Sequence, residues 1–251
     1  MKRLMTTITA ALLIGLTATA QHHEEVEWRC DVYRDIDLTK ACNQPLMSPQ
    51  QQDGTAQGLF AAIIDMAMKD RVTLYRHTVE GTECFSGSYR MTLKELFDDY
   101  QISYREKGGR MTVSTADIPY GDVTHCYVRE ASIYDAANST FKKRVVALCP
   151  VLAVNDELTG QEVRYPMCWL NYKDIEELLE GYATVASFEN MAQEVSLRDF
   201  FLLGLYQGDI YRDAKPYMEG TANDGTGGDH GNMALPEVAR PADAYHIKYK
   251  K

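Results

Sequence analysis

The middle third of the chain constrains the fold more than any other part. Residues Thr124–Tyr134 alternate polar and apolar side chains, and Lys143–Val154 form a more continuous apolar run. Residues 135–139 and 155–160 have the composition of turns. Alternation between turns is typical of antiparallel strands, so we expect a central three-stranded meander. The large side chains of its third strand are expected on one face: Val163, Tyr165, Met167 and Trp169.

Four further segments have the spacing of amphipathic helices, because their apolar residues recur three and four positions apart. The four stripes are Leu59, Phe60, Ile63, Met66 and Ala67; Leu93, Leu96, Phe97 and Tyr100; Ile175, Leu178, Leu179 and Tyr182; and Leu197, Phe200, Phe201 and Leu205. Thr92 with Glu95, and more weakly Ser196 with Asp199, have the spacing of a capping box. Helices and strands in separate runs predict a single α+β domain with a mostly antiparallel sheet.

The two ends of the chain differ from this central part. Residues 1–20 have a basic start, an apolar stretch and small residues before Ala20, as in a secretory signal peptide. The apolar stretch is shorter than the roughly 20 residues that a membrane span needs. Residues 216–251 include a glycine-rich run that cannot build a core. We therefore expect a signal peptide cleaved after Ala20, a domain at 21–215 and a disordered tail at 216–251.

The charge balance bounds the partners that the chain can bind. The chain has 26 Lys and Arg residues against 36 Asp and Glu residues, which gives a net charge of −10. Nucleic acid and anionic lipid attract proteins through clustered cations, so neither is expected as a partner. The same charge gives solubility and suits a basic protein partner.

The cysteine pattern leaves two interpretations open. An even number of cysteines in an exported protein is compatible with disulfides, whereas buried free thiols are also common. Irregular spacing without a Cys-x-x-Cys pair argues against a zinc site. The expected hairpin brings Cys149 near Cys168, and Cys126 with Cys149 is the alternative pair. The six cysteines are Cys30, Cys42, Cys84, Cys126, Cys149 and Cys168.

One short motif resembles a catalytic signature. Residues 35–39 match the Asp-x-Asp-x-Thr pattern of haloacid-dehalogenase phosphatases, in which a carboxylate attacks phosphate beside a magnesium ion. That chemistry requires a buried parallel strand before the motif, but residues 29–34 are polar and no doubly wound pattern follows. A periplasmic phosphatase-like hydrolase using Asp35 and Asp37 is therefore an alternative hypothesis, and an acidic turn is the favoured interpretation.

The sequence contains none of the common nucleophile, zinc-protease, dinucleotide or Walker motifs. Asp229 and His230 lie in the expected disordered tail, which cannot fix the geometry of a metal site. We therefore expect no catalytic residue, cofactor, metal or small-molecule substrate. A soluble ligand-binding module is a second alternative, because aromatic side chains with polar ends also suit binding surfaces. The aromatic residues on the expected sheet are Tyr127, Tyr134, Tyr165, Trp169 and Tyr172.

Several short motifs follow one another in a distinctive order. They are Arg34–Leu38 with Asn43–Leu46, Arg129–Asp135, Lys143–Val151 and Cys168–Tyr172. In that order, behind a secretion signal, they resemble the GldN/PorN family of Bacteroidetes gliding-motility and type IX secretion proteins. The likeness covers roughly residues 34–211. Residues 171–182 depart from it, being acidic where an arginine-containing segment is expected.

The resemblance implies a non-enzymatic protein of the periplasm, associated peripherally with the outer membrane. It implies a ring built from copies of the chain and an outer-membrane lipoprotein of the PorK/GldK type. The ring would connect to inner-membrane subunits of the PorL and PorM/GldM types. In such an assembly a few aromatic and arginine side chains carry most of the binding energy. We expect structural or interface roles for Arg34, Arg144, Trp169 and Tyr211.

Overall fold

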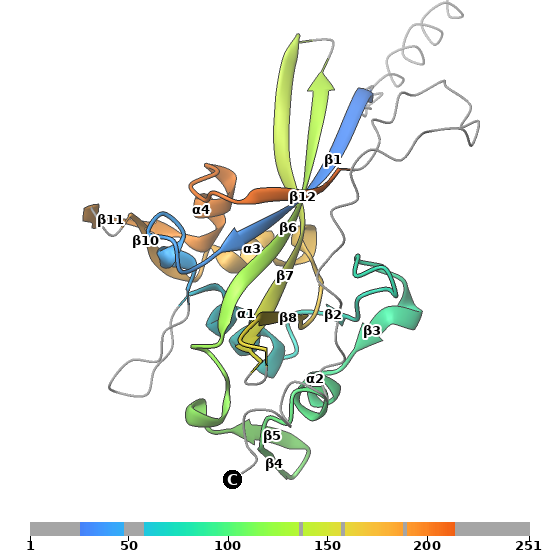
Figure 1. Ribbon diagram of the computed structural model, residues 1–251, viewed down its shortest axis with the longest axis vertical. Coiled ribbons are helices and arrows are strands. Elements are labelled where there is room, and N and C mark those ends of the chain that lie inside the picture. Colours follow the sequence, from blue (N-terminus) through green and yellow to red (C-terminus); the bar gives the residue numbers. More distant parts are fainter. Residues whose placement is uncertain (1–25, 48–57, 136–137, 157–158, 188–189, 214–251) are drawn as a thin grey trace, which may run out of the picture.

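The computed structural model describes residues 26–47, 58–135, 138–156, 159–187 and 190–213, and the expected signal peptide and tail lie outside these ranges. The fold is mixed α+β and mostly sheet (Figure 1). A six-stranded antiparallel sheet has the order β12-β1-β6-β7-β8, with β9 paired to β7. Its strands are β1 (Val26–Asp37), β6 (Val123–Asp135), β7 (Thr140–Asn155), β8 (Glu162–Pro166), β9 (Leu170–Asn171) and β12 (Asp209–Asp213).

Strands β6 and β7 correspond to the first two strands that the alternation predicts. They pair antiparallel from Val123 opposite Leu152 to Asp135 opposite Thr140. The third predicted strand is shorter than expected, because β8 ends at Pro166 and the chain continues to β9 after a break. The prediction that Trp169 shares a face with the preceding alternating residues is wrong. The break changes the alternation, since each side chain faces opposite to its neighbour only while the strand continues.

The sheet is larger than the expected three strands, because β1 and β12 extend it beyond β6. Strand β1 pairs with β6 over most of its length, from Val26 to Asp37. Its charged residues hide the strand pattern in the sequence, although they are paired in the fold. Strand β12 then lies beside β1, where Gly208 approaches so closely that a Cβ atom would lie 2.7 Å from the Asp35 carbonyl oxygen.

Within the described residues, four α-helices cover one face of the sheet and contribute buried apolar side chains to a cluster against it. The Thr92–Glu95 capping box is present in full, with Thr92 accepting from the Glu95 backbone and Glu95 accepting from the Thr92 backbone. At the fourth helix, Ser196 accepts from the Asp199 backbone and no reciprocal bond is formed, because Asp is shorter than the Glu or Gln of a full box. The helices are α1 (Leu59–Met68), α2 (Leu93–Asp99), α3 (Tyr172–Leu179) and α4 (Leu197–Leu202).

Small elements connect these helices and the sheet. Three antiparallel pairs stand outside the main sheet. They are β2 (Leu74–Tyr75) with β3 (Arg90–Met91), β4 (Tyr104–Lys107) with β5 (Arg110–Val113), and β10 (Ala183–Ser187) with β11 (Asn190–Ser196). The short 3-10 helices are η1 (Gln44–Leu46), η2 (Gly87–Tyr89) and η3 (Thr115–Asp117).

Two hydrophobic clusters occupy opposite faces of the sheet. The large cluster lies between the sheet and the helices, and includes Ile36, Val128 and Leu148. The second, which we call the aromatic cluster, lies on the other face because its residues alternate along each strand with those of the large cluster. The aromatic cluster consists of Tyr33, Tyr75, Tyr127, Ala147, Cys149, Val151 and Trp169.

Candidate functional site

Arg34 and Glu130 form the centre of an ionic network beside the large cluster. Glu130 is fully buried, and Arg34 Nε donates to its Oε2 at 2.6 Å. The Lys143 ammonium lies 2.7 Å from the other carboxylate oxygen, to which the Tyr206 hydroxyl donates at 2.6 Å. Burial alone would raise the pKa of Glu130, but these hydrogen bonds hold it below its usual value. Arg34 also donates to the Gly208 carbonyl, and so joins β1, β6 and the start of β12.

Arg129 forms a second network on the opposite face of the sheet. It makes ion pairs with Asp31 and Glu83, whose side chains are almost completely buried. Asp31 also accepts from Arg29 Nε at 2.7 Å, and Glu83 accepts from the Tyr33 hydroxyl at 3.0 Å. Burial opposes ionisation of Asp31, yet the two guanidinium groups lower its pKa overall. The network therefore holds the loop around Glu83 against the sheet.

Asp35 and Asp37 are not arranged as the hydrolase hypothesis requires. Asp35 pairs with Arg164, and its Oδ1 lies 2.9 Å from His125 Nδ1. Asp37 accepts hydrogen bonds from the backbone and hydroxyl of Thr39, which makes a local turn. Strand β1 runs antiparallel to both neighbours, whereas ligands of doubly wound folds bind beyond the ends of parallel strands. The phosphatase-like hypothesis is therefore wrong for this fold.

Trp169 and Tyr211 each pack against Tyr33 of β1. Trp169 is fully buried, and its ring meets that of Tyr33 edge-on at a centroid distance of 6.3 Å. Tyr211 lies 6.0 Å from Tyr33 and 4.9 Å from Tyr127, both in tilted geometry. These contacts fill the interior of the fold. Four of the five aromatic residues considered for a ligand-binding face are buried and closed to a ligand: Tyr127, Tyr165, Trp169 and Tyr172.

The outer part of the β6–β7 hairpin extends away from the helices, with the beginning of β1 beside it (Figure 1). We call residues 26–31, 130–135 and 140–145 the arm. Within it, β7 pairs with β6 on one side. On its other side, β8 and β9 pair with β7 only from Ala147 onward. Among the described residues, the outer edge of β7 in the arm therefore has no strand partner.

The arm presents apolar and basic side chains to solvent. Phe141 is 72% exposed, although its ring lies 4.9 Å from that of Tyr134. The next three residues are cations with exposed side chains: Lys142, Lys143 and Arg144. The first two pair with acidic residues of β6. Arg144 is thus exposed on the arm, whereas Arg34, Trp169 and Tyr211 lie within the body of the fold.

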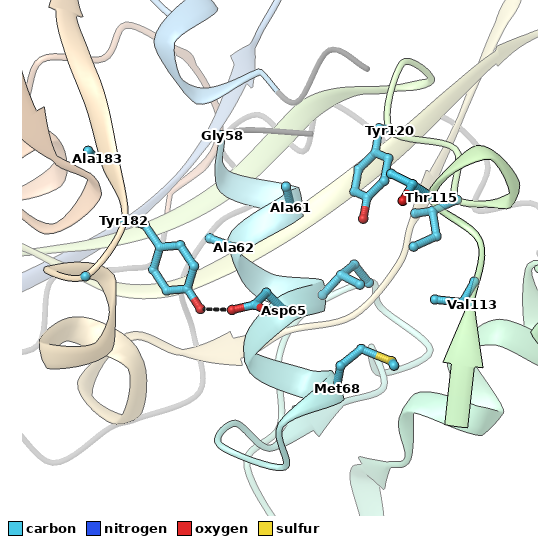
Figure 2. A pocket seen from close by; sticks show the side chains of 13 residues that line it. Gly58, Ala61, Ala62, Asp65, Met68, Val113, Thr115, Tyr120, Tyr182 and Ala183 are labelled. Carbon is cyan, nitrogen blue, oxygen red and sulfur yellow. Dashed lines mark hydrogen bonds between the residues drawn. The ribbon is translucent and has the colours of Figure 1, made fainter. Parts of the chain in front are cut away.

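A cavity of about 580 Å³ lies beside α1 (Figure 2). It is bordered by α1, by the segment from Val113 to Tyr120 and by the turn before β10. At its wall the Tyr182 hydroxyl donates to Asp65 Oδ2 at 2.5 Å. The cavity therefore combines apolar side chains with the hydroxyl groups of Thr115, Tyr120 and Tyr182 and one acidic side chain. None of the residues expected from the sequence to be functional lies in it.

A comparison with known protein families identifies the family of the chain. Residues 21–240 match the family described as gliding motility associated protein GldN. The chain belongs to the GldN family. This confirms the family that the order of the sequence motifs indicated. A search of curated proteins finds no match.

In this GldN-family chain, the motifs that carried the resemblance hold the sheet together. Arg129 and Glu130 are adjacent in one motif, and they anchor the two ionic networks on opposite faces. Asn43 belongs to another motif and is fully buried. Its side-chain amide donates to the carbonyls of Asp37 and Gln207 at 2.8 and 2.7 Å, and so ties the loop after β1 to the end of the domain.

The six cysteines of the GldN-family chain all lie within the described residues, and no disulfide joins any two of them. The expected Cys149–Cys168 disulfide is therefore not formed, and neither is the alternative Cys126–Cys149 pair. Cys149 packs in the aromatic cluster, whereas Cys126 and Cys168 pack in the large cluster on the other face. Burial raises the pKa of Cys126 and of Cys168 to about 12, so both stay protonated at neutral pH.

The arm edge, the cavity and Glu83 are not predicted from the sequence. The cavity had a weak signal in the small residues of α1 and of the turn at Gly181. Glu83 had none, because its partners lie far away in the sequence. In the described ranges, no helix is both long and apolar enough to cross a membrane. In the same ranges, no three His, Cys, Asp or Glu side chains are arranged to hold a metal ion.

Proposed function

We propose that this GldN-family chain is a periplasmic component of the gliding-motility and type IX secretion machinery, and that it acts by binding other proteins. The observation that carries the proposal is the family match over residues 21–240. The described contacts support a binding role, because the most buried charged side chains pair with one another within the fold. They serve the fold and are not grouped around the cavity.

The proposed partners follow from the family. One is an outer-membrane lipoprotein of the PorK/GldK type, with which copies of the chain would form a ring. Another is an inner-membrane subunit of the PorM/GldM type. A signal peptide cleaved after Ala20 would deliver the protein to the periplasm, where it would associate with the outer membrane through the lipoprotein.

The arm is the surface that best suits such a contact. A strand of another protein can add to the edge of a sheet through backbone hydrogen bonds. Phe141 supplies an exposed ring next to that edge, and aromatic and arginine side chains commonly dominate binding energy. Arg144 adds an exposed cation to this surface, although the net charge of the whole chain is negative. We infer that the partner contributes an extended segment with apolar and acidic side chains.

The test is recovery of partners after mild detergent extraction of cells that produce the tagged chain. The wild-type protein should recover the lipoprotein, and the double variant Phe141→Ser/Arg144→Glu should recover at least about tenfold less, equivalent to 1.4 kcal/mol. The control Leu202→Ser/Arg105→Glu alters a leucine that is 65% exposed and an exposed arginine outside the arm. It should recover wild-type amounts.

Two results would contradict different parts of the proposal. If the arm variant recovers as much lipoprotein as the control variant, the arm is not the contact surface. If the wild-type protein recovers neither the lipoprotein nor the inner-membrane subunit, the proposed function itself is rejected.

A further inference from the structure

Several of the residues that line the cavity beside α1 are small. Ala61 and Ala62 line it from α1, Gly181 lines it from the turn before β10, and Ala183 lines it from the start of β10. Gly58, at the start of α1, has a φ of +98°, and a Cβ atom there would lie 2.1 Å from the Met47 carbonyl oxygen. Only glycine tolerates this close approach. The volume of about 580 Å³ falls within the range of ligand-binding pockets.

One wall of the cavity is apolar. Ile64 and Met68 line it from α1, and Val113 and Ile118 line it from the segment that ends at Tyr120. None of these four side chains carries a group that forms a strong hydrogen bond. A ligand part that lies against this wall must therefore be apolar, and the alkyl part of a long side chain meets that requirement.

The acidic end of the cavity retains free hydrogen-bonding capacity. Asp65 Oδ2 accepts from Tyr182 at 2.5 Å and lies 2.6 Å from Lys69 Nζ. Within the described residues, Asp65 Oδ1 and the Tyr120 hydroxyl form no hydrogen bond. Burial opposes ionisation of Asp65, but the bonds from Lys69 and Tyr182 lower its pKa overall. Asp65 is therefore a carboxylate at neutral pH.

The ion pair between Lys69 and Asp65 does not prevent a second cation from binding to Asp65. The side chains of Lys69 and Asp65 are 57% and 41% exposed, and an exposed ion pair contributes only about 0–1 kcal/mol. The lysine contacts Oδ2 and leaves Oδ1 available. A second cation can therefore bind Asp65 without first displacing a strong partner.

We propose that this cavity binds an arginine side chain of another protein. The alkyl part of the arginine would lie against the apolar wall, and its guanidinium would donate to Asp65 Oδ1 and to the Tyr120 hydroxyl oxygen. Guanidinium suits two separate acceptors because it presents five N–H donors in a planar fork. The net charge of −10 favours the approach of a cationic partner. The inference depends on the cavity alone, so it stands apart from the proposed function.

The test is an NMR titration of the ¹⁵N-labelled full chain with N-acetyl-arginine amide. Resonances of residues 58–68, 113–120 and 181–183 should shift together, with a Kd of about 1 mM. N-acetyl-norleucine amide has a similar alkyl chain without the cation and should bind at least about tenfold more weakly, as expected for hydrogen bonds to a charged group. Shifts of equal size with norleucine, or shifts confined to other residues, would overturn the proposal.

Variants separate the acidic end from the rest of the cavity. Asp65→Asn keeps the shape of the side chain and should weaken arginine binding about tenfold, because it removes the carboxylate. Glu177→Gln removes an exposed carboxylate elsewhere and should bind like the wild type. N-acetyl-lysine amide should bind more weakly than the arginine probe. Equal binding by Asp65→Asn would refute the assignment of the acidic end, and tighter binding of lysine would refute the choice of arginine.

Discussion

The sheet face that carries the helices is filled mostly with apolar side chains and has one ionic network at Glu130, whereas the smaller aromatic cluster on the other face packs beside the ion pairs of Arg129. On the first face, all four helices contribute buried residues to the large cluster. On the second face, Tyr33, Tyr127 and Trp169 pack beside the ion pairs of Arg129. Removing a side chain therefore leaves an apolar cavity on the first face and an unpaired buried charge on the second.

Because of this difference, the packing of the helix-covered face can be inferred from the sequence, whereas the ion pairs on the aromatic-cluster face cannot. An apolar stripe at helical spacing is a local property, so a few neighbouring residues reveal it. The ion pairs of Arg129 join residues 46 and 98 positions away in the chain. No local pattern indicates such pairs, and their charges hide the strand that contains them.

The largest effect is expected on the helical face. Phe97 of α2 is fully buried in the large cluster, and Phe97→Ala should lower the free energy of unfolding by about 3–5 kcal/mol because it leaves a cavity. Chemical denaturation at pH 7 measures this. The exposed Phe141 provides the control, and Phe141→Ala should change the free energy of unfolding by less than about 0.5 kcal/mol. Equal effects of the two variants would contradict the burial of α2.

A smaller effect is expected on the charged face. Arg129→Met removes the shared partner of Asp31 and Glu83 and should destabilise the protein by about 3 kcal/mol, the lower end for a broken buried pair. The value stays at that end because Asp31 keeps Arg29 and Glu83 keeps Tyr33. Adding Glu83→Met should restore part of the loss, since one unpaired buried charge is then gone. A double variant that is less stable than the single variant would contradict this account.

The pH dependence of the Arg129→Met variant distinguishes the charged face from the apolar face in a second way. Arg129 and Arg29 lower the pKa of Asp31 in the folded protein. Stability from Asp31 is therefore present above its unfolded pKa, about 3.9, and is lost as the pH falls through the lower folded pKa. The penalty of Arg129→Met should shrink between pH 7 and pH 3, whereas the penalty of Phe97→Ala should stay constant. Denaturation curves across this range measure both.

The same contrast decides how much of the fold the sequence predicts. The stripe of α1, the capping box at Thr92 and the long β6–β7 pair all follow from spacing over a few residues. Strand β1 escaped prediction because Arg29, Asp31 and Arg34 make it too polar until their partners are known. Strand β12 pairs over only four residues of β1, which is too short for a recognisable alternation.

The sequence predicts which motifs belong to the family, but it predicts little of how the residues of these motifs and of the cavity are arranged in space. Arg34 and Arg144 were grouped as similar residues, yet Arg34 joins three strands while Arg144 is exposed on the arm. The disulfide expectation failed because the position of Cys168 after Pro166 depends on the break between β8 and β9. The cavity depends on three segments from distant parts of the chain, so spacing alone cannot predict it.

The smallest effect is expected at a helix end on the apolar face. Thr92 accepts from the Glu95 backbone at 3.1 Å and so satisfies a donor that the first turn of α2 leaves free. Thr92→Ala should lower the free energy of unfolding by about 1 kcal/mol. Thr92→Ser keeps the hydroxyl and should retain most of the stability, and chemical denaturation compares the two variants.

The N-caps of α2 and α4 differ, because only the N-cap of α2 is part of a full capping box. Comparing them shows whether stability comes from the single side-chain bond or from both bonds of the box. Ser196 makes the same bond to the Asp199 backbone at 3.0 Å but receives no bond in return. If the single side-chain bond carries the effect, Ser196→Ala should cost as much as Thr92→Ala. If the reciprocal bond from the Thr92 backbone to Glu95 matters, Ser196→Ala should cost less, because removing Thr92 Oγ1 also frees the Glu95 side chain that it contacts at 2.8 Å. We expect the second result, since a capping box satisfies two free donors whereas a lone cap satisfies one.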